Sequence, residues 1–164
     1  MAKWDIKDGF WRLMTERGSE YNFAYVLLQE KGKPPKIVTP TPMQMGWTQS
    51  QPFFCAAAET ARDVAQEYAQ TKVGSLPAHK FDLYTKTTKE YKAMKNISQN
   101  NEELLYLIEV FVDDFVGMCI PQNKIHLDHV SRAIQHGIHD IFPPDNNNDE
   151  DPTSHKKLKK GDGA

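Results

Sequence analysis

Two adjacent aspartates, Asp113 and Asp114, interrupt an apolar, β-branched run at residues 109–118. Side chains of a strand alternate between its two faces, so an unbroken strand here would bury one carboxylate without a partner. A tight turn between the two acids avoids that cost. We therefore predict a hairpin with strands over residues 105–112 and 115–120, and with both carboxylates at its tip, where they can reach solvent or a metal ion.

Periodic patterns elsewhere predict the elements that pack around this hairpin. Apolar residues recur at helical spacing over residues 50–70 and again over residues 127–141. Each stretch has one apolar face, which is typical of a helix packed against a sheet. Residues 21–29 and 36–41 are extended on either side of a glycine- and proline-containing turn and predict a second hairpin. The predicted fold class is α+β, a small antiparallel sheet with helices packed on one face.

The chain is predicted to form one domain followed by a tail. Its 164 residues are enough for a single domain with a substantial core. We place that domain at residues 1–142, with a polar insertion at residues 71–101 that is rich in lysine and threonine. Residues 143–164 contain few apolar side chains and change from acidic to basic, so we expect a polar, mobile tail.

Composition restricts the partners and the compartment. The 20 basic and 22 acidic residues give a formal net charge of −2, so nucleic-acid binding would require local basic patches. Cys55 and Cys119 both lie in apolar surroundings, which favours buried free thiols over a disulfide. No run is long and apolar enough for a membrane span, and the first residues form no signal peptide. We therefore expect an intracellular protein, cytoplasmic or nuclear, that is neither secreted nor membrane-bound.

Three short motifs occur in order along the chain. They are residues 3–11 (KWDIKDGFW), residues 45–50 (MGWTQS) and residues 111–114 (FVDD). Together they resemble the successive palm motifs of reverse transcriptases, the RNA-directed DNA polymerases, and more closely those of retrotransposon-like transposable elements. The resemblance spans most of residues 3–120 and implies a reverse-transcriptase palm-like fold.

This resemblance implies a nucleotidyltransferase that uses two magnesium ions, with manganese as a substitute. The implied catalytic residues are Asp5, Asp113 and Asp114. Asp5 and Asp113 would hold both ions, the Ile6 carbonyl would complete one site, and Asp114 would be a supporting or third ligand. The ions would activate the primer 3′-hydroxyl and stabilise the leaving pyrophosphate.

The resemblance also implies a nucleotide-binding surface. Asp8 would place its backbone amide near the triphosphate, and the ring of Phe10 would lie under the sugar and exclude a 2′-hydroxyl. Gly46, Trp47 and Ser50 would position the templating base pair and the incoming nucleotide. The full set of implied nucleotide-binding residues is Asp8, Gly9, Phe10, Met45, Gly46, Trp47, Ser50 and Val112.

The implied partners are a primed RNA or DNA template and deoxynucleoside triphosphates. Because the first motif begins at residue 3, we expect a fragment of a longer polyprotein, whose fingers, thumb and, where present, ribonuclease H regions lie outside this chain. Positioning of the substrates contributes much of the rate of such enzymes. We therefore expect the fragment to bind magnesium weakly and to be inactive alone.

The same residue types also occur in ordinary structural roles. Aspartates are common at strand ends and in turns, and Phe10, Trp11 and Trp47 are also compatible with core packing. The alternative function is a decayed or domesticated element fragment that acts as a non-catalytic nucleic-acid or protein interaction module. A third is an unrelated metal-dependent phosphotransfer enzyme. The histidines of residues 126–139 have a spacing compatible with zinc but no partner ligands nearby, so we predict a solvated helix face.

Overall fold

The computed structural model describes residues 1–28, 31–79, 82, 86–87, 89–94, 104–120, 123–144, 151–154 and 157–161. The chain forms two compact units. The first comprises Met1–Lys7 and Cys55–Ala164, and the second comprises Asp8–Phe54.

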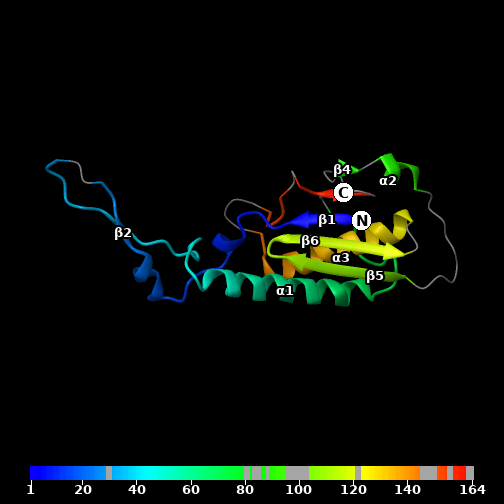
Figure 1. The fold of residues 1–164 in the computed structure, drawn as a ribbon, viewed down its shortest axis with the longest axis horizontal. Coiled ribbons are helices and arrows are strands. Elements are labelled where there is room, and N and C mark those ends of the chain that lie inside the picture. The colour runs from blue at the N-terminus through cyan, green and yellow to red at the C-terminus, as the bar shows by residue number, and fades with distance from the viewer. Residues whose placement is uncertain are drawn as a thin grey trace. The chain divides into compact units, whose positions relative to one another are not determined.

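The first unit is built on a five-stranded sheet with the strand order β4-β7-β1-β6-β5 (Figure 1). Neighbouring strands are antiparallel except β4 and β7, which are parallel. The predicted α+β class, with a small antiparallel sheet and helices packed against it, is confirmed at this level. The strands are β1 (Ala2–Asp5), β4 (Lys86–Thr87), β5 (Leu105–Phe111), β6 (Asp114–Ile120) and β7 (Lys159–Lys160).

Two long helices form where the apolar spacing predicts them, as α1 (Ser50–Ala69) and α3 (Lys124–Ile141). A short helix, α2 (Lys89–Ala93), precedes β5. α3 packs on β6 and lies behind the sheet in Figure 1. Gly137 of α3 allows a close approach to α1, because an added Cβ would lie 2.4 Å from the Ala61 carbonyl oxygen. Among the helices that the structure describes, none combines the length and apolar character needed to cross a bilayer.

The core of the first unit lies between the sheet and α3. Trp4 and Phe115 are opposite each other in β1 and β6, and both are fully buried. The Trp4 indole Nε1 donates a hydrogen bond to Ser131 Oγ of α3 at 3.1 Å. Because successive strand residues alternate, Lys3 and Asp5 on either side of Trp4 belong to the opposite, open face of the sheet.

The described part of residues 143–164 packs into the first unit, whereas the sequence predicts a tail outside the domain. The mobility of the tail stays a prediction. β7 pairs with β1, with Lys159 opposite Lys3, and β7 thereby covers an edge of β1. Leu158 is fully buried and Lys160 is nearly so. A two-residue strand has no periodic pattern to detect, and its burial depends on partners that lie far away in the sequence.

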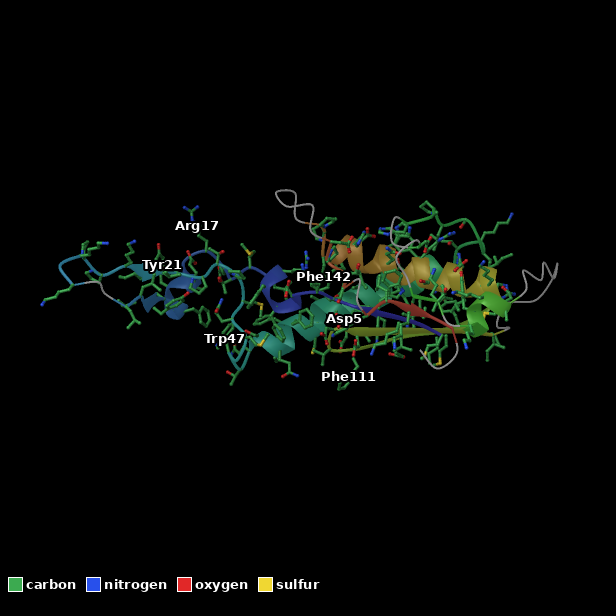
Figure 2. All side chains as sticks on the ribbon, turned by 90° about the horizontal axis from the view of Figure 1, so that it is seen from above. Asp5, Arg17, Tyr21, Trp47, Phe111 and Phe142 are labelled. Carbon is green, nitrogen blue, oxygen red and sulfur yellow. The ribbon has the colours of Figure 1, made fainter. Side chains whose placement is uncertain are left out.

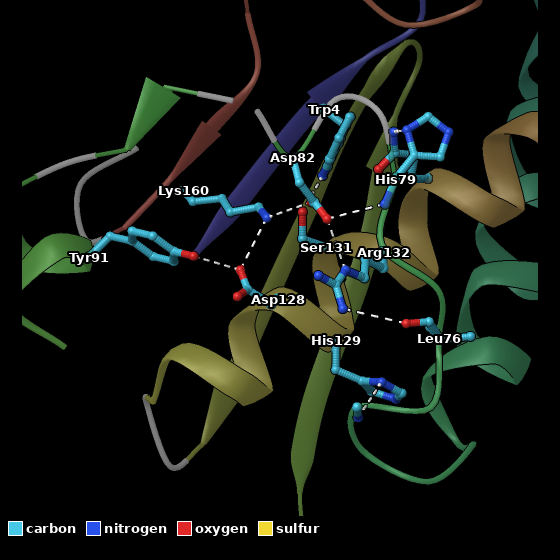
Figure 3. Close-up of polar contacts among 12 residues, drawn as sticks. Trp4, Leu76, His79, Asp82, Tyr91, Asp128, His129, Ser131, Arg132 and Lys160 are labelled. Atoms are coloured by element: carbon cyan, nitrogen blue, oxygen red, sulfur yellow. Dashed lines mark hydrogen bonds and ion pairs between the residues drawn. The ribbon is translucent and has the colours of Figure 1, made fainter. Parts of the chain in front are cut away.

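Buried Lys160 and partly buried charges connect this strand to α3 and to the predicted insertion (Figure 3). Lys160 Nζ lies 3.1 Å from Asp82 Oδ1 and 3.1 Å from Asp128 Oδ1. Arg132 Nε lies 3.0 Å from Asp82 Oδ2, and the Tyr91 hydroxyl donates to Asp128 Oδ1 at 2.7 Å. Burial acts to raise the pKa of Asp82, but Lys160 and Arg132 outweigh it and lower that pKa. Asp82 and Tyr91 of the predicted insertion are therefore packed parts of the first unit.

The second unit contains the predicted second hairpin in a shorter form. Tyr25 pairs with Val38 and Val26 with Ile37. Residues 21–23, at the start of the predicted first strand, instead form the end of the 3-10 helix η2. The elements of this unit are η1 (Gly9–Arg12), η2 (Ser19–Phe23), β2 (Tyr25–Val26) and β3 (Ile37–Val38).

Candidate metal and nucleotide site

The turn that joins β5 and β6 consists of Val112 and Asp113, one residue earlier than predicted. Phe111 and Asp114 are the opposed residues that close the hairpin, so Asp114 lies in β6 and not at the tip. Val112 has a φ of 58°, a left-handed conformation that is unfavourable for a β-branched residue. Asp114 stays in the strand because it is paired on both sides, with Phe111 of β5 and Asp5 of β1.

The register of the sheet brings the first and third motifs together. Asp5 is directly opposite Asp114, so both side chains project from the same, open face of the sheet. The Ile6 amide donates to the Asp113 carbonyl oxygen at 3.0 Å, which holds the turn beside the end of β1. Asp5, Ile6, Asp113 and Asp114 therefore lie at adjoining positions, although the sequence separates them widely.

The carboxylate of Asp5 is buried and already paired with a cation. Only 3% of Asp5 is exposed, and Lys157 Nζ lies 2.6 Å from Asp5 Oδ2. Burial raises the pKa of Asp5, the neighbouring Asp113 and Asp114 raise it further, and Lys157 partly opposes them. In return, the hydrogen bond to Asp5 raises the pKa of Lys157. Any divalent cation that binds Asp5 must therefore compete with an ammonium group.

Asp114 offers an unused oxygen. Its Oδ2 lies 3.3 Å from Lys3 Nζ, but its buried Oδ1 accepts no hydrogen bond from any residue that the structure describes. A buried acceptor of this kind suits a hard cation, and carboxylate oxygens are the ligands that magnesium prefers. The donor chemistry therefore fits. Within the described ranges, however, no three His, Cys, Asp or Glu side chains are arranged to hold a metal ion.

The first group of predicted nucleotide-binding residues begins the second unit. Asp8 has a φ of 56°, and a Cβ added to Gly9 would lie 2.4 Å from Phe54 Cζ. The ring of Phe10 packs on the ring of Phe54, with their centroids 4.7 Å apart. Phe10 is thus a packing residue of its own unit, and its role in excluding a 2′-hydroxyl stays a prediction.

The middle motif lies in an aromatic cluster of the same unit. Trp47, labelled in Figure 2, has ring centroids 5.3 Å from Phe23 and 6.4 Å from Phe53. Gly46 has a φ of 93°, which favours glycine. Met45 and Trp47 are both exposed. The middle motif therefore presents a partly exposed aromatic surface.

Ser50 is buried and takes part in a local cap. Its Oγ donates to the Gln44 carbonyl oxygen at 2.7 Å, and Gln44 Nε2 donates to the Pro42 carbonyl oxygen at 2.8 Å. The hydroxyl of Ser50 therefore stabilises the loop before α1, and contact with a nucleotide would require it to leave this bond.

The histidines of α3 do not form the predicted solvated face. His129 is buried, and its Nδ1 accepts a hydrogen bond from the Gly74 amide at 3.3 Å (Figure 3). His139 Nδ1 lies 3.3 Å from His79 Nε2, and His139 Nε2 lies 3.2 Å from Asp151 Oδ2. These imidazoles connect α3 to segments before and after it, which helical periodicity alone could not show.

Asp5, Asp113 and Asp114 are called the acidic site below. Sequence reasoning also missed the two lysines that contact this site, Lys3 and Lys157. Lys3 could have been found, because residues two apart on a strand share a face and Lys3 precedes Asp5 by two. Lys157 had no local signal, since its contact depends on how the C-terminal residues return to β1. The chain matches no protein family, no curated protein and no solved structure to which it was compared.

Proposed function

We propose that this chain is the palm region of a retrotransposon-like reverse transcriptase, an RNA-directed DNA polymerase. The observation that carries the proposal is the register that sets Asp5 opposite Asp114, with Asp113 in the adjoining turn. Three carboxylates from two distant motifs thereby reach one end of adjacent strands. A palm-like sheet with an open face and a helix-covered face would present them to a primed RNA or DNA template.

In this proposal, the chain's own residues bind the cations and orient the substrates. Asp5 and Asp113, with the Ile6 carbonyl, would hold two magnesium ions, and Asp114 would supply a further oxygen. Bound magnesium or manganese would supply Lewis-acid stabilisation of the attacking 3′-hydroxyl and the leaving pyrophosphate. The Asp8 amide would meet the triphosphate of a deoxynucleotide, and Phe10 would exclude a ribonucleotide sugar.

The strained turn supports a functional role for the hairpin. A valine at a φ of 58° costs on the order of 1–2 kcal/mol relative to glycine or asparagine. Strain of this kind persists where the surrounding structure requires it, and it clusters at active sites. The turn at Val112 is flanked by the Ile6–Asp113 hydrogen bond and by the Asp5–Asp114 pair, and these contacts require its left-handed conformation.

The sharpest test is Mn²⁺ binding to the chain of residues 1–164, measured by calorimetry with wild type, Asp5→Asn and Asp113→Asn. We expect each substitution to weaken Mn²⁺ binding at least tenfold, because each removes a ligand charge. Asp63→Asn is the matched control, since Asp63 is an exposed aspartate of α1. Equal affinity in wild type, Asp5→Asn and Asp113→Asn would overturn the proposal.

A primer-extension assay with a primed RNA template, deoxynucleotides and magnesium then addresses the reaction. Alone, the chain is expected to give no extension above an Asp113→Asn blank, because substrate positioning is worth roughly 7–11 kcal/mol in well-oriented systems. In the proposal, fingers and thumb regions of a longer polyprotein supply that positioning. Adding those regions should give extension that depends on Asp113.

A second candidate function is a non-catalytic interaction module. Two observations favour it. Lys157 neutralises Asp5 as in an ordinary structural ion pair. The open face of β5 and β6 also carries exposed apolar side chains and a pocket of about 350 Å³. Phe111 projects from this face, away from the helices (Figure 2). The exposed residues are Leu105, Leu107, Phe111, Met118 and Ile120.

A further inference from the structure

The C-terminal segment, defined here as residues 151–154 and 157–161, follows the edge of β1 that adjoins Asp5. The Lys7 amide donates to the Pro152 carbonyl oxygen at 2.7 Å, and the Ser154 amide donates to the Asp5 carbonyl oxygen at 2.8 Å. Further along, Lys159 is opposite Lys3 in β7. The backbone of this segment therefore runs beside both ends of β1 and contacts the backbone of Asp5 itself.

One side chain of the C-terminal segment reaches the acidic site. Lys157 Nζ lies 2.6 Å from Asp5 Oδ2, and the Lys157 side chain is 55% exposed whereas the Asp5 side chain is 4% exposed. The ammonium group supplies positive charge to a carboxylate that lies next to Asp113 and Asp114. It does so from the solvent side, so its side chain can leave Asp5 without unpacking the core.

Other contacts keep the C-terminal segment attached when Lys157 leaves. Leu158 is fully buried, and Lys160 Nζ lies 3.1 Å from both Asp82 and Asp128. The two lysines therefore have different roles in the same segment. Lys160 is a buried anchor, and Lys157 is an exposed cation at the end of a long side chain.

We propose that Lys157 and a divalent cation compete for the Asp5 carboxylate, so that the C-terminal segment acts as an autoinhibitory latch on the metal site. This inference rests on the proposed function, because it takes Asp5 as a metal ligand. The ligand class is a hard divalent cation such as Mg²⁺ or Mn²⁺, which would bind the oxygen that Lys157 occupies. Removing the ammonium leaves Asp5 buried without its partner, and this increases the gain from binding a cation.

The first experiment compares Mn²⁺ affinity in wild type, Lys157→Met and Lys159→Met. Methionine keeps an unbranched apolar stem and removes the charge, and exposed Lys159 of the same segment is the matched control. We expect Lys157→Met to bind Mn²⁺ about tenfold more tightly than wild type, and Lys159→Met to match wild type. Equal or weaker binding by Lys157→Met, with binding still dependent on Asp5, would overturn the latch and leave the metal site intact.

The same titration separates failure of the latch from failure of the proposed function. If Asp5→Asn binds Mn²⁺ as wild type does, and Lys157→Met/Asp5→Asn binds as Lys157→Met does, Asp5 is not a metal ligand. That result overturns the proposed function and the latch together. Circular dichroism of each variant shows whether it has folded before its affinity is compared.

A second readout follows the lysine directly and requires no activity. Acetylation by a small amine-reactive reagent, read by mass spectrometry, reports how free each ammonium group is. We expect labelling of Lys157 to rise several-fold at saturating Mn²⁺ and to be high in Asp5→Asn without Mn²⁺, while labelling of Lys160 stays low. Labelling of Lys157 that is unchanged when Mn²⁺ occupies an Asp5-dependent site would contradict the competition.

Discussion

Asp5 and Asp114 are opposite each other across β1 and β6, and this pairing places both carboxylates on the open face of the sheet. A slip of one residue would turn Asp5 toward the helix-covered face and expose Trp4. Trp4 is fully buried and bonded to Ser131, so its packing fixes the register on which the acidic site depends. Two adjacent residues of one four-residue strand, Trp4 and Asp5, therefore contribute to the core and to the candidate site on opposite faces of the sheet.

Trp4→Phe tests how firmly this register is held. Phenylalanine retains an aromatic ring in the core but loses the hydrogen bond to Ser131 and leaves that buried hydroxyl without its indole donor. We expect the free energy of unfolding to fall by about 2 kcal/mol, measured by urea denaturation. The double variant Trp4→Phe/Ser131→Ala should lose less stability than the sum of the losses of Trp4→Phe and Ser131→Ala, because the hydrogen bond can be lost only once. Strict additivity would show that the hydrogen bond contributes nothing.

Lys160→Met tests whether the C-terminal segment is a structural part of the sheet. The substitution leaves Asp82 and Asp128 partly buried without the ammonium they share. Loss of one partner from a buried charge network typically costs about 3–5 kcal/mol, and we expect about 3 kcal/mol because Arg132 and Tyr91 still contact these aspartates. Lys159→Met, in the neighbouring exposed position, should stay within about 0.5 kcal/mol of wild type. Similar unfolding midpoints for Lys160→Met and Lys159→Met would show that the contacts of Lys160 with Asp82 and Asp128 do not stabilise the protein.

Val112→Gly tests the strain in the hairpin turn. Glycine adopts a φ of 58° without a steric penalty, so we expect the free energy of unfolding to rise by about 1 kcal/mol. Val112→Ala keeps a Cβ and should give a smaller gain. If the turn serves the acidic site, Val112→Gly should also weaken Mn²⁺ binding, because it loosens the position of Asp113. A fall in stability on Val112→Gly would show that the valine side chain contributes more than its backbone costs.

The half-buried cluster of His79, His136 and His139 predicts a loss of stability in mild acid. Burial lowers the pKa of His79 to about 4, with His139 and His136 lowering it and Asp151 and Asp82 opposing. Because the folded pKa is below the unfolded value near 6.5, the stabilisation is complete above pH 6.5 and is lost as the pH falls toward 4. Between pH 7 and pH 5 we expect the free energy of unfolding to fall by about 1–2 kcal/mol. His79→Gln should flatten this slope, and an unchanged slope in that variant would assign the effect to other groups.

Sequence periodicity was sufficient for the elements whose pattern is local. The apolar repeats predicted α1 and α3, because a helix that packs by one face must repeat its apolar residues every three or four positions. The alternation around Asp113 and Asp114 predicted the β5–β6 hairpin but placed its turn one residue late. That error arose because Val112, a residue rarely found in a left-handed turn, occupies one.

The sequence by itself determined the two helices, the hairpin and the short acidic motifs, since each is encoded by neighbours a few residues apart. Only the tertiary structure decided which of these acids meet and what neutralises them. The pairing of β1 with β6 places Asp114 opposite Asp5. The return of the C-terminal segment to β1 places Lys157 beside Asp5. Both pairings join residues that are far apart in the sequence. They can form only when the packing of the core around Trp4 compensates the entropy lost in closing the intervening loops.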